Sequence, residues 1–223
     1  MNIDYFSRTR ILDGGMGQQL LAKGLKTKGS LWSATALLDK NYHQMIIDAH
    51  LDFIKSGAEV IITNNFSARR VRMVQNKVDK HFNYANQKAG ELAVKARETS
   101  KKNIMIGGSL PAQNDTYVFD KRDKNVIAKG FYDQAMLLKP FVDFFYLDVL
   151  SSSKECEIAL NICEKLNLPV LVGIHIKKNG KLPSNETISD LYKKCKNNNW
   201  LGLVAACVSP EIIENAIDEI QQF

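Results

Sequence analysis

The chain has 223 residues, of which 45% are hydrophobic and 24% charged, and this composition excludes the collagen-like, disordered and disulfide-stapled classes. Its net charge of +6 comes from lysines spread along the whole chain, so we expect a solvated surface and no nucleic-acid partner. No apolar run approaches the roughly 20 residues of a membrane span, and the first ten residues lack a signal peptide's apolar segment. We therefore expect a cytoplasmic protein without a membrane partner.

The tightest basic cluster is Arg69, Arg70 and Arg72. Side chains at this spacing do not share one face of a helix, which favours a charged helix exterior over an anion site. The four cysteines are too few for a disulfide framework in a chain of this length, so we expect thiols or metal ligands. Cys156 and Cys163 are predicted to pack in the core, and Cys195, in a lysine-rich helix, to lie at the surface.

The predicted elements alternate between short apolar strands and amphipathic helices. A glycine cluster at 14, 15 and 17 follows the first strand, but its spacing does not fit a dinucleotide-binding fingerprint. The predicted strands are 10–13, 59–65, 103–109, 142–148, 169–175 and 200–206, and the predicted helices are 41–56, 82–101, 126–139, 154–166, 186–197 and 210–220.

This alternation predicts an α/β fold with a parallel sheet, because right-handed strand–helix–strand connections are nearly obligatory for the pattern. A closed barrel and an open doubly wound sheet both satisfy it. The length fits a single domain over residues 1–223.

Polar residues stand at the carboxyl ends of the predicted strands, where ligands bind in both kinds of parallel fold. They carry carboxylate, hydroxyl, amide, imidazole and thiol groups, a set that suits a polar substrate. The residues are Asp13, Thr63, Asn64, Asn65, Ser109, Asp148, His175 and Cys207. We expect them to meet at one mouth.

Several ordered motifs give the chain a resemblance to the homocysteine S-methyltransferase family. They are DGGMG at 13–17, LWSA at 31–34, SGA at 56–58, TNNFSA at 63–68, and GGSLP at 107–111 followed by Tyr117. The resemblance implies a TIM-type parallel (β/α) barrel with a zinc ion. It also implies methyl transfer from S-methylmethionine, betaine or a methylated folate to homocysteine, giving methionine, and hence a role in methionine biosynthesis.

The resemblance also implies roles for particular residues. Asp13, Gly14 and Gly15 match the amino-acid pocket, where Asp13 would hold the substrate ammonium, and Asp148 stands where the family usually has glutamate. Asn64, Asn65 and Ser109 are expected to complete substrate binding. Cys207 matches the first of three zinc-binding cysteines, whereas the other two lie on an eighth strand that this chain lacks. About six of the eight β/α units are present, so the zinc site is incomplete.

Alternatives follow from these departures. The open barrel edge would be covered by a second chain carrying the missing strands or by a homodimer, or the chain is truncated. The protein is then either a methyltransferase, or a non-catalytic or split-enzyme relative that keeps the amino-acid pocket. Asp148, His175 and Cys207 end successive strands and could together hold a metal, against the alternative that His175 is a hydrogen-bonded histidine.

Overall fold

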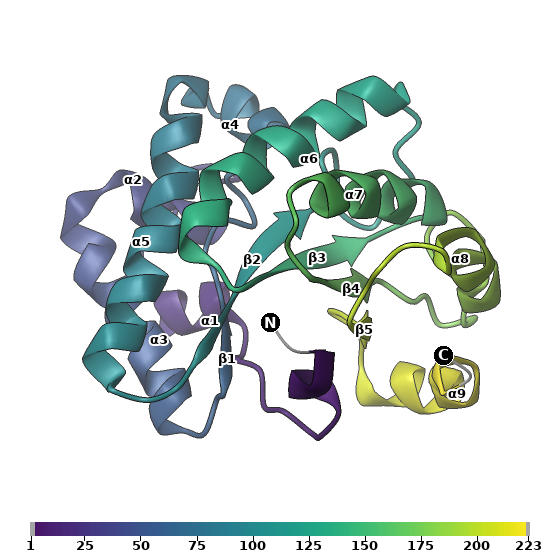
Figure 1. Cartoon of the computed structure of the whole chain (residues 1–223). Coiled ribbons are helices and arrows are strands. Elements are labelled where there is room, and N and C mark those ends of the chain that lie inside the picture. Colours follow the sequence, from purple (N-terminus) through teal and green to yellow (C-terminus); the bar gives the residue numbers. More distant parts are fainter. Residues whose placement is uncertain (1–2, 222–223) are drawn as a thin grey trace. The chain divides into compact units, whose positions relative to one another are not determined.

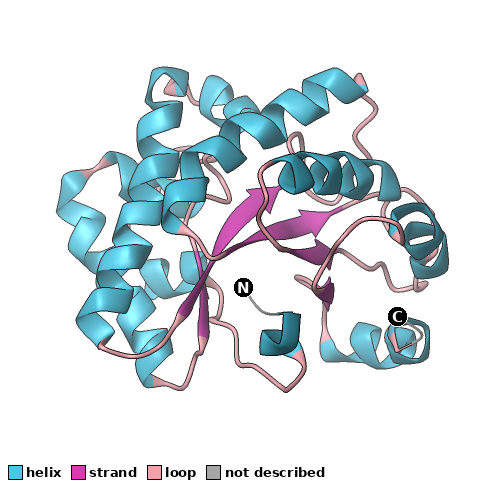
Figure 2. Ribbon diagram, in the orientation of Figure 1, coloured by secondary structure: helices cyan, strands magenta, loops and turns pink. Residues whose placement is uncertain are grey.

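The computed structural model describes residues 3–221 of the chain, which group into two compact units. The first unit comprises Met1–Ser109 and Gln134–Phe144, and the second comprises Leu110–Asp133 and Phe145–Phe223. Each unit contains parallel strands connected through helices, as Figures 1 and 2 show. The single-domain assignment stays a prediction.

The first unit pairs two parallel strands and surrounds them with helices. β1 (Val60–Ile62) runs beside β2 (Met105–Pro111), with Val60 opposite Met105 and Ile62 opposite Gly107. The helices of this unit are α1 (Met16–Ala22), α2 (Thr35–Leu38), α3 (His43–Lys55), α4 (Arg70–Gln75), α5 (Phe82–Ser100) and the end of α6 (Lys124–Leu138).

The second unit contains three parallel strands in chain order, β3-β4-β5. They are β3 (Phe144–Leu150), β4 (Val170–Ile174) and β5 (Gly202–Ala205). Helices α7 (Ser153–Lys165), α8 (Ile188–Cys195) and α9 (Pro210–Ile220) follow these strands in turn. All of β4 is buried, which accounts for its continuous apolar sequence.

The predicted first strand, 10–13, is wrong as a full strand. The segment makes a single parallel bridge, Leu12 to Val60, supported by hydrogen bonds from Glu59 N to Ile11 O and from Asp13 N to Val60 O. The pairing ends where Gly14 and Gly15 turn the chain toward α1. The other five predicted strands each overlap a strand of the structure.

Two predictions about single side chains are also wrong. Arg69 is 1% exposed rather than on a helix exterior, because it precedes α4 and its guanidinium lies over the Phe66 ring. Cys195 is buried because it shares a helix face with Ile188 and Leu191, while the neighbouring lysines point elsewhere. The predicted burial of Cys156 and Cys163 is confirmed.

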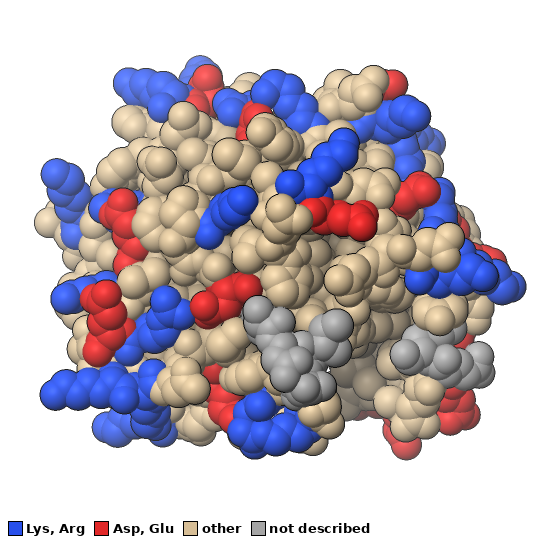
Figure 3. Space-filling view, in the orientation of Figure 1, with Lys and Arg blue, Asp and Glu red and all other residues tan. Residues whose placement is uncertain are grey.

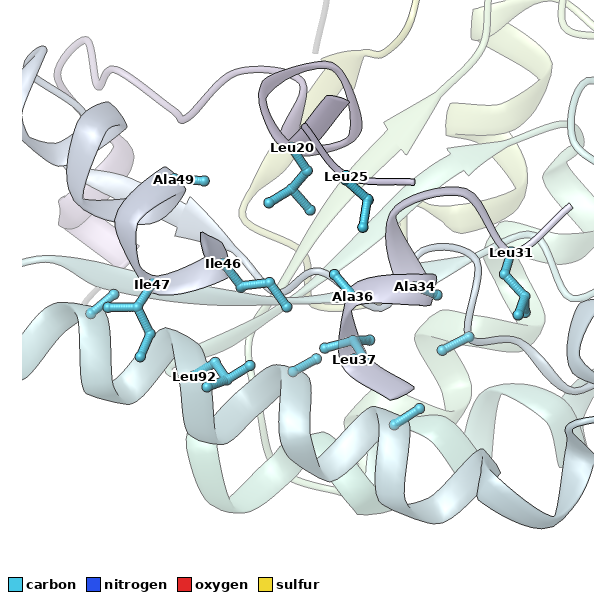
Figure 4. Packing of buried hydrophobic residues seen from close by; sticks show 14 of the residues in the cluster. Leu20, Leu25, Leu31, Ala34, Ala36, Leu37, Ile46, Ile47, Ala49 and Leu92 are labelled. Carbon is cyan, nitrogen blue, oxygen red and sulfur yellow. The ribbon is translucent and has the colours of Figure 1, made fainter. Parts of the chain in front are cut away.

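The core of the first unit is an aliphatic layer between helices. Leu20 of α1, Leu37 of α2, Ile46 of α3 and Leu92 of α5 all belong to it, and Figure 4 shows these side chains directed toward one another. On the face drawn in Figure 3, lysine and arginine are interspersed with acidic residues, as expected of a solvated surface. Within residues 3–221, no helix is both long and apolar enough to cross a bilayer.

Position 17 of the DGGMG motif must be glycine because Trp32 packs against it. A Cβ atom on Gly17 would lie 1.9 Å from Nε1 of Trp32, so the indole occupies the space that any side chain at position 17 would need. Trp32 itself has φ of 50° and is 40% exposed. The two motifs, DGGMG and LWSA, are therefore one packing arrangement.

We predict that Gly17→Ala displaces the Trp32 indole and lowers the free energy of unfolding by about 1–3 kcal/mol, the usual cost of overpacking. Urea unfolding and the red shift of tryptophan emission measure the two effects. In a Trp32→Ala background the same change removes no contact and should stabilise α1 by up to about 1 kcal/mol, because alanine favours the helix. Destabilisation of equal size in both backgrounds would contradict this explanation.

Candidate functional site

The predicted site residues fall into two groups, one in each unit. The Asp13 cluster consists of Asp13, His50, Asn64, Asn65 and Ser109, and lies in the first unit. The Cys207 cluster consists of Tyr117, Asp148, His175 and Cys207, and lies in the second.

Asp13 is fixed by the backbone of the neighbouring strand. Its Oδ2 accepts a hydrogen bond of 2.8 Å from the Ile62 N–H, and its side chain is 5% exposed. Gly14 and Gly15, by contrast, are exposed, and a Cβ on Gly14 would press on the Phe53 ring at 2.9 Å. The turn therefore presents open backbone next to an immobilised carboxylate, an arrangement suited to a charged small ligand.

His50 lies behind Asp13 on α3. It is fully buried, and its Nδ1 is 4.0 Å from Asp13 Oδ2. Neither ring nitrogen has a hydrogen-bond partner among the described residues. Burial lowers the pKa of His50 from 6.5 to about 4, so the ring is neutral at pH 7 and adds no positive charge beside Asp13.

Asn65 joins the ends of the two strands in the first unit. Its side-chain amide donates to Ser109 O at 2.9 Å and to Asn86 Oδ1 at 3.0 Å, and its Oδ1 accepts from the Thr63 hydroxyl at 2.6 Å. Ser109 N donates in turn to Thr63 Oγ1. The polar groups of Asn65 and Ser109 are thus used in hydrogen bonds within the protein.

Asn64 has an unused acceptor. Its amide nitrogen donates to Ser33 O at 3.2 Å, which anchors the side chain, while its buried Oδ1 has no hydrogen-bond partner among the described residues. An unpaired buried carbonyl is costly, so a ligand N–H or a water is the expected partner. Of the two asparagines predicted to bind substrate, Asn64 is the one whose side-chain oxygen is unpaired.

The Cys207 cluster brings four side chains together. The Tyr117 ring lies 4.4 Å from the His175 ring, centroid to centroid, and the Tyr117 hydroxyl hydrogen-bonds to the Cys207 sulfur. Asp148, within β3, is close enough to raise the pKa of both Tyr117 and Cys207. The register of β3 against β4 shifts between Leu147 and Leu150, around Asp148, where Val149 has φ of 62°.

In the Cys207 cluster, the pKa shifts favour the uncharged forms of Tyr117, His175 and Cys207 beside the Asp148 carboxylate. Burial raises the pKa of Cys207, and the charge of Asp148 raises it further, whereas the hydrogen bond from Tyr117 lowers it. Burial, together with Cys207, raises the pKa of Tyr117 to about 12. Burial lowers the pKa of His175, partly offset by a hydrogen bond with the Ala206 backbone. Cys207 is therefore a thiol at neutral pH, although its residue surface is exposed.

A zinc ion does not fit these residues as they are arranged. In the described part of the chain, no three His, Cys, Asp or Glu side chains form a group that could hold a metal ion. Cys207 alone, or with the predicted Asp148 and His175, does not constitute a preformed metal centre there.

Sequence reasoning missed two contributors. Asn86 on α5 donates to Ala68 O and Phe82 O and accepts from Asn65, but an asparagine inside a helix carries no distinctive motif. Gln134 Nε2 donates to Asn86 Oδ1 at 3.1 Å. The one available signal was their polar character at positions that a helical pattern assigns to the buried face.

The titration of His50 predicts how stability depends on pH. Its folded pKa lies below 6.5, so its stabilising contribution is complete above pH 6.5 and is lost as pH falls toward 4. Between pH 7 and 5 the loss is about 2 kcal/mol. Glu155 on α7 has the opposite effect on stability. Burial raises its pKa to about 7, so its contribution to the stability of the fold grows as pH falls from 7 toward 4.5.

We therefore predict that, on going from pH 7 to pH 5, the change in the free energy of unfolding is more favourable in His50→Leu than in wild type by about 2 kcal/mol. Glu155→Gln should shift the same difference in the opposite direction. Urea unfolding at both pH values measures it. Parallel behaviour of the two variants would refute the assigned pKa directions.

The thiol of Cys207 offers a second prediction. It should be alkylated by iodoacetamide before Cys156, Cys163 and Cys195, which are buried. Tyr117→Phe removes the hydrogen bond that lowers the pKa of Cys207, so the midpoint of its alkylation rate against pH should rise. Asp148→Asn removes a charge that raises this pKa, so the midpoint should fall. Mass spectrometry of the modified peptide follows both shifts, and shifts of the same sign would contradict the arrangement.

Comparisons with known proteins match this fold and these motifs. A sequence model of the family described as "Homocysteine S-methyltransferase" matches residues 10–223. Homocysteine S-methyltransferase 2 of Zea mays is 24% identical over 246 aligned residues, which cover 95% of this chain and 69% of the maize protein. Homocysteine S-methyltransferase of Escherichia coli is 36% identical over 89 residues, 40% of this chain and 28% of that protein.

The solved structures agree on the fold. The homocysteine methyltransferase MmuM from Escherichia coli, in its metallated form, superposes with a TM-score of 0.87 at 21% identity, covering 99% of this chain and 83% of that one. Its apo form gives a TM-score of 0.77 at 19% identity, covering 99% and 82%. The chain has the architecture of a partial TIM-type (β/α) barrel, and it belongs to the homocysteine S-methyltransferase family.

Proposed function

We propose that this chain binds homocysteine and takes part in methyl transfer to its thiol, with a sulfonium such as S-methylmethionine as the donor. The observation that carries the proposal is the match of the family model over residues 10–223, together with the immobilised Asp13 beside the exposed Gly14–Gly15 backbone. Betaine and a methylated folate are the competing donors. The same proposal places the protein in methionine biosynthesis.

The two clusters would bind different parts of the substrates. Asp13 attracts the substrate ammonium, and neutral His50 leaves that attraction undiminished. The unpaired Oδ1 of Asn64, which follows β1, is a further candidate acceptor for a substrate N–H group. In the second unit, Tyr117, Asp148 and Cys207 supply polar groups suited to a sulfur atom or to a cationic donor.

The transfer itself is a displacement at carbon. The homocysteine sulfur forms a bond to the donor methyl carbon, the carbon–sulfur bond of the sulfonium breaks, and its electron pair stays on the leaving sulfide. The thiol proton goes to solvent or to a carboxylate. In the family, zinc makes the attacking thiolate available at neutral pH. Because the described residues of this chain do not fit a zinc ion, no step is assigned to the metal here.

That lack of fit favours a second candidate, a homocysteine-binding relative that does not catalyse transfer by itself. The two candidates share the Asp13 cluster and differ in the reaction. Binding and turnover therefore have to be measured separately, on the same preparation.

The decisive test combines calorimetry of homocysteine binding with a transfer assay using trideuteromethyl donors and added zinc. Asp13→Asn should weaken binding about 10- to 100-fold, as expected when a charge-assisted hydrogen bond is lost. Asp48→Asn, on the solvent side of α3, is the matched control and should bind as wild type does. Deuterated methionine from the chain alone supports the methyltransferase. Binding without product supports the non-catalytic relative, and absence of binding refutes both.

A further inference from the structure

A cavity of about 400 Å³ opens in the first unit, apart from the Asp13 cluster. It lies between the loop before η2 (Trp32–Ala34), helix α2, and the segment that joins α4 to η4 (Asp79–His81). Its lining residues are Lys28, Gly29, Leu31, Thr35, Leu38, Asn76, Val78 and His81. None of them has a role in the proposed reaction, and the volume falls in the range that small-molecule sites occupy.

The two walls of the cavity are fastened to each other, so the cavity exists without a ligand. Asn76 accepts from Ser30 N at 3.1 Å and donates to Ser30 Oγ at 2.8 Å and to Arg72 O at 2.7 Å. A Cβ on Gly29 would lie 2.2 Å from Asn76 Oδ1, and Gly29 has φ of 51°, so glycine is needed at this contact. The wall that contains Gly29 is also tied to α2, by a hydrogen bond from Lys28 N to Thr35 Oγ1 at 3.0 Å.

The floor of the cavity is apolar and continuous with the core. Leu31 is 2% exposed and belongs to the aliphatic layer of the first unit, and Figure 4 shows its side chain beside the helix that carries Ala34 and Ala36. Leu38 and Val78 are partly buried and pack against the same layer. A ligand group of a few apolar carbon atoms would be removed from water on this surface.

The rim is basic. Lys28 and His81 are exposed lining residues, and the lining contains no acidic side chain. The two segments that form the walls, 26–30 and 76–81, add Lys26, Lys77 and Lys80 against one acidic residue, Asp79. Such a rim attracts anions and disfavours ligands that carry an ammonium. The amino acids of the proposed reaction therefore suit this cavity poorly.

We propose that this cavity is a second binding site, for a small amphipathic carboxylate with a short apolar body and no amino group. The carboxylate binds at the rim between Lys28 and His81, and the apolar body lies on Leu31, Leu38 and Val78. Binding stabilises the contact between the two walls, because the ligand bridges segments that are more than 40 residues apart in sequence. The site is independent of the proposed methyl transfer.

The test is a titration of the full chain, labelled with ¹⁵N, followed by amide chemical shifts. The probe is sodium hexanoate, and the matched neutral probe is hexanamide. Hexanoate should produce saturable shifts in residues 28–31 and 76–81, with an affinity about tenfold or more above that of hexanamide. Inorganic phosphate, which has no apolar body, should bind more weakly than hexanoate.

Two variants make the outcome specific. Lys28→Glu should weaken hexanoate binding about tenfold or more, whereas Lys95→Glu, on an exposed position of α5, should leave it unchanged. Equal binding of hexanoate and hexanamide would overturn the anionic part of the proposal, and stronger binding of phosphate would overturn the amphipathic part. Absence of shifts in the two wall segments would overturn it altogether. A thermal melt of Lys28→Glu confirms that any loss of binding is not a loss of fold.

Discussion

The hydrogen-bond network around Asn65 is the constraint on which the first unit depends. A parallel sheet ends in backbone and side-chain groups that need partners, and here they are buried with the strand ends. Thr63, Asn65, Asn86 and Ser109 hydrogen-bond to one another, and Asn86 also donates to Ala68 O and Phe82 O and accepts from Gln134, so neutral groups connect β1 and β2 to α5 and α6. Because such networks hold a unique geometry only when fully paired, each change in it has consequences for the carboxylate and glycines nearby.

Some of the strained backbone positions belong to the family motifs or stand beside the clusters, whereas others, such as Lys101 and Asn167, do not. Trp32, Tyr117, Val149 and Cys207 all have positive φ values, between 50° and 67°, and each belongs to a family motif or stands beside a cluster residue. Such conformations cost roughly 1–3 kcal/mol each for residues other than glycine, and they persist only where the surroundings impose them. At Trp32 the strained backbone carries the indole that packs on Gly17, and at Cys207 it carries the thiol itself.

The sequence predicts the alternation of strands and helices well because each buried strand has a continuous apolar run with a polar residue at its end. It fails at 10–13, where the apolar run is too short to sustain a ladder and glycines interrupt it. Local patterns also could not predict the burial of Arg69, which precedes α4 and lies over the Phe66 ring, or of Cys195, whose helix face is turned toward the core. For the candidate site, the ordered motifs predict Asp13 and Asn64, and the family resemblance predicts Cys207. The distinction between Asn64, with an unpaired acceptor, and Asn65, with none of its amide hydrogens free, exists only in three dimensions.

The electrostatics of Cys207 bear on what chemistry this chain can do alone. A thiol that accepts a hydrogen bond from Tyr117 gains some thiolate character, but Asp148 and burial outweigh that gain, so the pKa stays above its ordinary value. A metal would reverse the balance, since a divalent cation neutralises Asp148 and deprotonates the sulfur it binds. The carboxylate that disfavours the thiolate in the absence of a cation is therefore the group that would favour a cationic species nearby, whether a metal or a sulfonium. The positively charged methyl donor proposed above would suit this cluster better than a neutral donor, because the negative charge of Asp148 attracts a cation.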